Sequence, residues 1–215
     1  AGSVTVYSYG FMIALGIVAG MSYLIIAGRK EVSLTFDQAN TLFLCIFLAA
    51  LAGGKLFLFF EDPSNYLDHP RQLFTGRGFV FYGSFLLAIP TMWWFFRKHK
   101  LPLYKSLDVM AITTCLVHMF GRMGCFMAGC CYGRPTDSLF GVIYSDPECY
   151  AEPLHTSLFP VQLFEAVYIL LVMLFLIFLK PRKQFEGQLF LTYLILYAVG
   201  RFVLEFFRGD SERGF

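Results

Sequence analysis

The chain has 215 residues, of which 57% are hydrophobic and 15% are charged, and its mean hydropathy is +0.62. These values exclude an ordinary soluble domain and are typical of a polytopic membrane protein. The net charge of +2 is too small to indicate binding to nucleic acid, and we expect no such partner.

Several hydrophobic stretches are long enough to cross a bilayer, which takes about 20 residues in a helix. The sequence predicts six of them, at about 5–28, 39–60, 79–96, 107–131, 159–179 and 187–207. We therefore predict an all-α polytopic membrane protein in which residues 1–215 form a single transmembrane domain. Two longer loops, 61–78 and 132–158, separate the spans, and the second is long enough to form a small subdomain beside the lipid headgroups.

The distribution of Lys and Arg between the loops predicts the orientation of the chain, because cytoplasmic loops carry more of both. Loops one, three and five are rich in these residues, whereas the two longer loops and the tail carry fewer. The odd-numbered loops are therefore predicted to be cytoplasmic, and the N-terminus and both long loops to lie outside. A seventh helix after residue 215 would return the chain to the cytoplasm, and we expect one.

The first two spans contain residues that suit either packing or ligand binding. Gly16 and Gly20 form a small-xxx-small face that favours close contact with another helix. Tyr9 lies near the outer end of its span, where it would anchor the helix at the interface or contact a ligand. Lys55 lies several residues inside the second span, from which it can reach the interface or a ligand.

The fourth span carries His118 and Arg122 on one helical face, with no acid nearby in the sequence. A charged side chain at the centre of a bilayer costs about 2.5–3.5 kcal/mol on insertion scales, so Arg122 requires a partner or an anionic ligand. Glu165 lies in the first turns of the fifth span. It either stabilises the dipole of that helix or pairs with Arg122.

The sixth span ends with Arg201, Glu205 and Arg208 on one face, at steps of four and three residues. Arg201 and Glu205 have the spacing of an ion pair within a helix, which leaves one cation over. Together with Arg122, and with Lys55 as a further candidate, these cations predict a positive cavity in the outer half of the bilayer. Arginine binds phosphate through two parallel hydrogen bonds, so the cavity suits a lipid phosphate.

The six cysteines do not indicate a disulfide framework, because most of them lie in or near predicted spans. None of the spacings is CxxC, and we predict no metal site. Cys125, Cys130 and Cys131 are interpreted as small packing residues, with thiol chemistry or metal binding as the alternatives.

Five segments together resemble a known family. YSYGFMIALG, FVFYG, GRMGCFMAGCCYGRPT, PVQLFEAVY and GRFVLEFFRGD resemble, in order and spacing, the motifs of the prolipoprotein diacylglyceryl transferases. The resemblance covers almost the whole chain. It implies an enzyme that transfers diacylglycerol from phosphatidylglycerol to the lipobox cysteine in the signal peptide of a lipoprotein precursor, which gives a thioether and releases glycerol phosphate.

The resemblance also implies roles for individual residues. Arg122 and Arg201 match the family's phosphate-binding arginines, Glu205 and Arg208 match its supporting charged pair, and Tyr9 and Gly133 match a tyrosine of the first span and the closing glycine of the signature. Glu165 and Lys55 are added as substrate-binding candidates from their positions alone.

The chain departs from the family pattern at three positions. Tyr82 stands where the family often has a histidine, and it is assigned as a catalytic residue by position only, since a tyrosine with a pKa near 10 is a weak base. Cys125 replaces the signature asparagine and Cys130 replaces an acidic residue. Another acceptor for the same lipid donor, or a non-catalytic phospholipid-binding membrane protein, therefore remains an alternative. We expect no cofactor, and a location in the bacterial cytoplasmic (inner) membrane with the site toward the outer leaflet.

Overall fold

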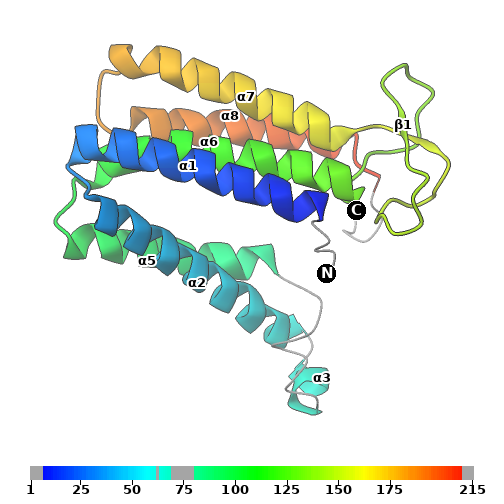
Figure 1. Ribbon diagram of the computed structural model, residues 1–215, viewed down its shortest axis with the longest axis horizontal. Helices are drawn as coiled ribbons and strands as arrows, with labels where there is room; N and C mark the ends of the chain where they lie inside the picture. The colour runs from blue at the N-terminus through cyan, green and yellow to red at the C-terminus, as the bar shows by residue number, and fades with distance from the viewer. Residues whose placement is uncertain (1–6, 62, 69–79, 210–215) are drawn as a thin grey trace, which may run out of the picture. The chain divides into compact units, whose positions relative to one another are not determined.

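The described part of the chain is mainly helical, as the prediction of an all-α membrane protein requires. The computed structural model describes residues 7–61, 63–68 and 80–209. The helices are α1 (Ser8–Val32), α2 (Phe36–Glu61), α3 (Pro63–Asp68), α5 (Phe81–Lys98), α6 (Leu103–Ala128), α7 (Val161–Leu179), the 3-10 turn η1 (Lys180–Arg182) and α8 (Gln188–Glu205), as Figure 1 shows.

Five helices of the described residues are long and apolar enough to cross a membrane: α1, α2, α6, α7 extended by η1, and α8. The predicted span at 79–96 is also a helix, α5, but it contains Pro90, ends in Arg97 and Lys98, and is not among the five. Most of the predicted external loop 61–78 lies outside the described residues, apart from the short helix α3.

The chain divides into two compact units, one formed by residues 1–24 and 107–215 and the other by residues 25–106. In the first unit α6, α7 and α8 share a buried core. Its members come from all three helices and are Ala111, Ile112, Cys115, Ile169, Val172, Leu176, Leu189 and Tyr193. The prediction of a single transmembrane domain remains a prediction.

The predicted small-residue face of α1 packs against α6. A Cβ atom on Gly16 would lie 2.9 Å from Cβ of Phe120, and one on Gly20 would lie 2.6 Å from Cγ2 of Val117. Real Cβ atoms do not approach that closely, so the two glycines bring the helices into contact. This contact holds the N-terminal half of α1 beside the part of α6 that carries Arg122.

Asp108 of α6 caps the start of α8 from a distance. Its carboxylate accepts hydrogen bonds from the backbone N–H groups of Gly187 (3.0 Å) and Phe190 (3.1 Å), and from Nζ of Lys183 (2.9 Å). The first N–H groups of a helix have no partner within the helix, and a carboxylate there also favours the helix dipole. Asp108 is 1% exposed, so this cap is part of the core.

In the second unit α2 and α5 cross with their backbones in close contact at Gly53 and Gly83. A Cβ atom on either glycine would overlap the carbonyl of the other. Gly53 and Gly83 are therefore packing residues of this crossing.

The segment after α6 contains two short antiparallel strands, β1 (Val142–Ile143) and β2 (Ser157–Leu158). Tyr144 fastens this segment to α6, because its hydroxyl donates a hydrogen bond to the carbonyl of Phe126 at 3.1 Å. Burial raises the pKa of Tyr144 to about 12, so it remains a neutral donor at any physiological pH.

Candidate active site

Arg122 pairs with Glu165, which is one of the two roles that the sequence predicted for this glutamate. Nη2 of Arg122 on α6 lies 3.0 Å from Oε1 of Glu165 on α7, and Glu165 is 1% exposed. Nε2 of His118 lies 3.3 Å from both Oε1 of Glu165 and Nε of Arg122. When His118 Nε2 carries a proton it donates to Glu165, and when it does not it accepts from Arg122.

Arg201 on α8 joins the same group. Nη1 of Arg201 pairs with Oε2 of Glu205 one turn later, which confirms the pair predicted from their spacing. Arg201 also interacts electrostatically with Glu165. The buried carboxylate of Glu165 therefore interacts with cations of two different helices, Arg122 and Arg201.

Tyr197 is a member of the site that the sequence did not single out. Its ring lies edge-on to His118 at a centroid distance of 5.3 Å, and its hydroxyl interacts with Arg122. The available signal was its position four residues before Arg201, on the same face of α8.

Tyr9 of α1 lies on the same site. Its ring packs on Gly124 of α6, where an added Cβ would lie 3.2 Å from Cδ2 of the tyrosine. Tyr9 interacts electrostatically with Arg122 and with Cys125, Cys130 and Cys131. It is also 45% exposed, so it can contact a bound molecule as well as the protein.

Gly133 joins the signature segment to the end of α8. Its N–H donates to the carbonyl of Phe159 at 2.8 Å, and the residue forms an antiparallel bridge with Arg208. Arg134 strengthens the junction, because its N–H donates to the carbonyl of Phe207 at 3.0 Å and its Nε to that of Arg208 at 3.0 Å. The junction fixes Arg208, which is 7% exposed. The role of Gly133 in substrate binding remains a prediction.

The three cysteines of the signature come together. Helix α6 ends at Ala128, so the predicted helix to residue 131 was too long, and Cys130 and Cys131 lie in the turn that follows. Hydrogen bonds with the thiols of Cys125 and Cys130 lower the pKa of Cys131, and the cations Arg208 and Arg122 lower it further, whereas the neighbouring thiols and burial raise the pKa of Cys130.

Lys55 and Tyr82 belong to the other unit, on α2 and α5. Tyr82 is 76% exposed and Lys55 is half-buried. Their participation in the site, including Tyr82 as a catalytic group, remains a prediction.

The chemistry of the described site suits a phosphate ester. Of the five N–H donors of Arg122, the contacts to Glu165, His118 and Tyr197 use about three, which leaves roughly two for an anion. Because the buried Glu165 interacts with both Arg122 and Arg201, it neutralises part of their charge and lets them stay close together without a ligand. An incoming phosphate is met by guanidinium groups whose positions are already fixed.

Comparisons with known proteins show which family the chain belongs to. The family model described as prolipoprotein diacylglyceryl transferase matches residues 1–215. A phosphatidylglycerol–prolipoprotein diacylglyceryl transferase of Clostridium tetani (strain Massachusetts / E88) is 34% identical over 208 residues, which cover 96% of this chain and 82% of the relative.

Two further relatives carry the same name. That of Geobacter sulfurreducens (strain ATCC 51573 / DSM 12127 / PCA) is 33% identical over 214 residues, covering 96% of this chain and 79% of the relative. That of Dehalococcoides mccartyi (strain CBDB1) is 30% identical over 211 residues, covering 98% and 81%. The match over the whole chain and the arginines gathered around Glu165 lead to one conclusion: this protein belongs to the prolipoprotein diacylglyceryl transferase family.

Proposed function

We propose that this transferase moves the diacylglyceryl group of phosphatidylglycerol onto the lipobox cysteine in the signal peptide of a lipoprotein precursor. The cysteine sulfur attacks the glycerol carbon that carries the phosphate ester. A carbon–sulfur bond forms as the carbon–oxygen bond breaks, glycerol phosphate leaves with the bonding electrons, and the thiol proton is released. The products are a thioether and glycerol phosphate.

The observation that carries this proposal is that Arg122 and Arg201, from two helices, both interact with the buried carboxylate of Glu165. Negative charge on the phosphate grows as the carbon–oxygen bond breaks. Cations that are already oriented stabilise that charge without reorganisation, and they act more strongly where water is scarce. Glu205, Arg208 and Tyr9 complete the proposed substrate site.

The proposed location is the bacterial cytoplasmic membrane, with the site toward the outer leaflet. Its support is the excess of Lys and Arg in the odd-numbered loops. One such loop begins at the end of α5, where Arg97 stacks on Trp93 at 5.3 Å and Lys98 on Trp94 at 4.7 Å. Tryptophan beside a cation is typical of a membrane interface.

The experiment that tests the activity uses the full chain in phosphatidylglycerol vesicles with a synthetic peptide that contains a lipobox cysteine. Mass spectrometry should detect a peptide whose mass has increased by one diacylglyceryl group, together with free glycerol phosphate. A peptide with serine in place of cysteine should give no product, because an alcohol is far less ionised than a thiol at neutral pH.

A second set of vesicles tests whether the enzyme requires phosphatidylglycerol or accepts any phospholipid bilayer. Vesicles of phosphatidylethanolamine carry the same acyl chains but a cationic amine in the headgroup, and they should give no product. Product from both lipids would show that the headgroup is not selected. Lipid binding without product from either vesicle would overturn the proposed activity.

A further inference from the structure

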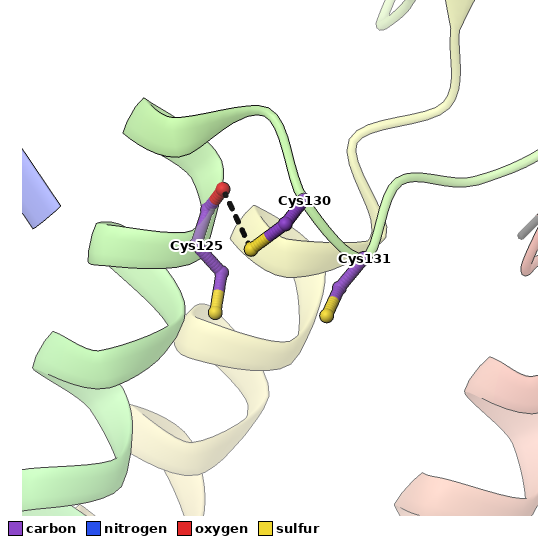
Figure 2. Close-up of side chains that lie close together, drawn as sticks. All are labelled: Cys125, Cys130 and Cys131. Carbon is purple, nitrogen blue, oxygen red and sulfur yellow. Dashed lines mark hydrogen bonds between the residues drawn. The ribbon is translucent and has the colours of Figure 1, made fainter. Parts of the chain in front are cut away.

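The turn after α6 brings three thiols into one place. Gly129 (φ 73°) and Cys131 (φ 62°) both adopt left-handed backbone, which reverses the chain directly after the helix. The sulfur atoms of Cys125, Cys130 and Cys131 all lie within 4.8 Å of one another, and none of the three forms a disulfide. Figure 2 shows the three sulfurs as a triangle, with Cys125 on the helix and the other two on the turn.

Main-chain contacts fix this turn from several sides. The N–H of Cys130 donates to the carbonyl of Cys125 at 3.1 Å, and Nε2 of Gln162 donates to the carbonyl of Cys130 at 2.7 Å. Gln162 on α7 is 1% exposed, so its amide is held by the core. The N–H of Tyr150 donates to the carbonyl of Ala128 at 3.0 Å. The thiols therefore gather on a supported scaffold, as a ligand site requires.

The spacing of the sulfurs suits a thiophilic metal ion. Zinc binds thiolate sulfur at about 2.3 Å, so three sulfurs around one ion lie about 4 Å apart. Small side-chain rotations would bring the three sulfur–sulfur distances, now within 4.8 Å, to that value. Three protein ligands with a fourth position open are the pattern of catalytic zinc sites, whereas structural sites use four. Among the described residues, these three are the group of potential metal ligands that lies close enough to share an ion.

The residues around the three cysteines suit the charge of a zinc–thiolate site and leave the site accessible. Three thiolates around a divalent ion carry a net charge of about −1. Arg122 and Arg208 interact electrostatically with Cys131, so two cations face that charge. All three cysteines are half-buried and not fully buried, which leaves a path for an ion and for an incoming thiol.

We propose that Cys125, Cys130 and Cys131 bind a zinc ion whose open position takes the acceptor thiol. The acceptor binds as thiolate and its proton is released to solvent. The zinc-bound sulfur then attacks the glycerol carbon of the lipid, the carbon–oxygen bond breaks, and glycerol phosphate leaves toward Arg122. The thioether product, which is a weaker ligand than a thiolate, dissociates from the ion. The role in the reaction rests on the proposed function, whereas the binding of zinc does not.

The first test measures the metal site directly. The full chain in detergent, reduced and freed of metal with a chelator, is equilibrated with one equivalent of zinc. X-ray absorption at the zinc edge should show three sulfur ligands at about 2.3 Å. A shell of nitrogen and oxygen ligands, or no retained zinc, would overturn the site.

Variants assign the sulfurs to these residues. Cys130→Ser/Cys131→Ser should lower zinc affinity by at least about 100-fold, since only one thiolate remains. Cys45→Ser, which changes a cysteine of α2 outside the cluster, should leave affinity unchanged. If the double variant does not fold, the sulfur count of the unsubstituted protein still decides whether the site exists.

The second test asks whether the acceptor thiol binds to the zinc ion, independently of whether the enzyme is active. Addition of the lipobox peptide in the absence of phosphatidylglycerol should raise the number of sulfur ligands from about three to four, and a serine peptide should not. Thioether formation with the count unchanged would overturn the acceptor role and leave the activity standing. A fourth sulfur without any product on adding lipid would overturn the activity and leave the zinc site standing. Equal turnover of metal-free and zinc-loaded protein would also overturn the acceptor role.

Discussion

Arg122 and Glu165 form an ion pair between α6 and α7, with 3.0 Å between Nη2 and Oε1, inside two segments that can cross a membrane. The carboxylate is 1% exposed and faces a second cation, Arg201. A buried pair of this kind contributes little net stability compared with apolar side chains, but removal of one partner leaves an uncompensated charge. The carboxylate compensates the charge of the two arginines and so lets both remain in place to bind an anion.

Replacement of Glu165 by glutamine should therefore destabilise the protein. Arg122, which is only 18% exposed, then lacks its counter-charge, and loss of one partner of a buried pair costs up to about 3–5 kcal/mol. The midpoint of thermal unfolding in detergent should fall, and addition of phosphatidylglycerol should restore part of the loss because its phosphate replaces the carboxylate. The exposed Glu148→Gln serves as the control and should leave the midpoint unchanged. An unchanged midpoint in Glu165→Gln would contradict the assigned pair.

Arg122→Lys should keep the charge and lose most of the turnover. A lysine offers a point charge on a flexible chain and cannot donate to Glu165, His118 and a phosphate in fixed directions at once. We expect the turnover number with phosphatidylglycerol to fall by about 100-fold or more, by analogy with the loss of one oriented donor to a developing charge. Arg182→Lys, in the exposed turn η1 that follows α7, is the matched control and should retain activity. Wild-type turnover in Arg122→Lys would show that charge alone is sufficient.

The sequence predicted those parts of the protein that depend on local periodicity. Apolar runs located every long helix to within a few residues, and the i,i+4 spacing of Arg201 and Glu205 predicted their ion pair. The small-residue face of Gly16 and Gly20 is in contact with α6, as predicted. Each of these features lies within one helix or on one face, where the 3.6-residue repeat determines which residues are neighbours.

Contacts between residues far apart in the chain could not be predicted from the sequence. The partner of Arg122 could not be chosen before α7 was placed beside α6, and Tyr197 entered the site only through α8. The cysteines were interpreted as packing residues because their spacing is not CxxC, but a turn with left-handed backbone at Gly129 and Cys131 brings them together. Spacing alone does not reveal such a turn, since Cys131 adopts a conformation that few non-glycine residues favour.

Gly133→Ala should weaken the junction between the signature segment and α8. A Cβ at this position would lie 2.5 Å from the carbonyl oxygen of Phe159 and 2.7 Å from that of Phe207, and backbone cannot move aside as a side chain can. Overpacking of this kind costs about 1–3 kcal/mol. Turnover should fall as well, because Arg208 is positioned by the same junction. Gly10→Ala is the control: no described atom lies within 4 Å of its added Cβ, and alanine favours a helix.

Asp108 provides a test of the fold that does not involve the active site. Asp108→Ala removes a buried acceptor for two N–H groups at the start of α8 and for Lys183. Loss of a helix cap costs about 0.5–2 kcal/mol, and the partly exposed Lys183 also loses its ion-pair partner. The unfolding midpoint should fall clearly, and hydrogen exchange at the N–H groups of Gly187 and Phe190 should accelerate.

Asp108→Asn separates the two contributions, because the amide oxygen still accepts a hydrogen bond but carries no charge for Lys183 or for the helix dipole. Its midpoint should lie between those of Asp108→Ala and the unsubstituted protein. Asp37→Asn is the control, since that aspartate lies in the first turn of α2 but is exposed. If Asp108→Ala and Asp37→Asn shift the midpoint equally, the distant cap is not a determinant of stability and α8 is held by its apolar contacts alone.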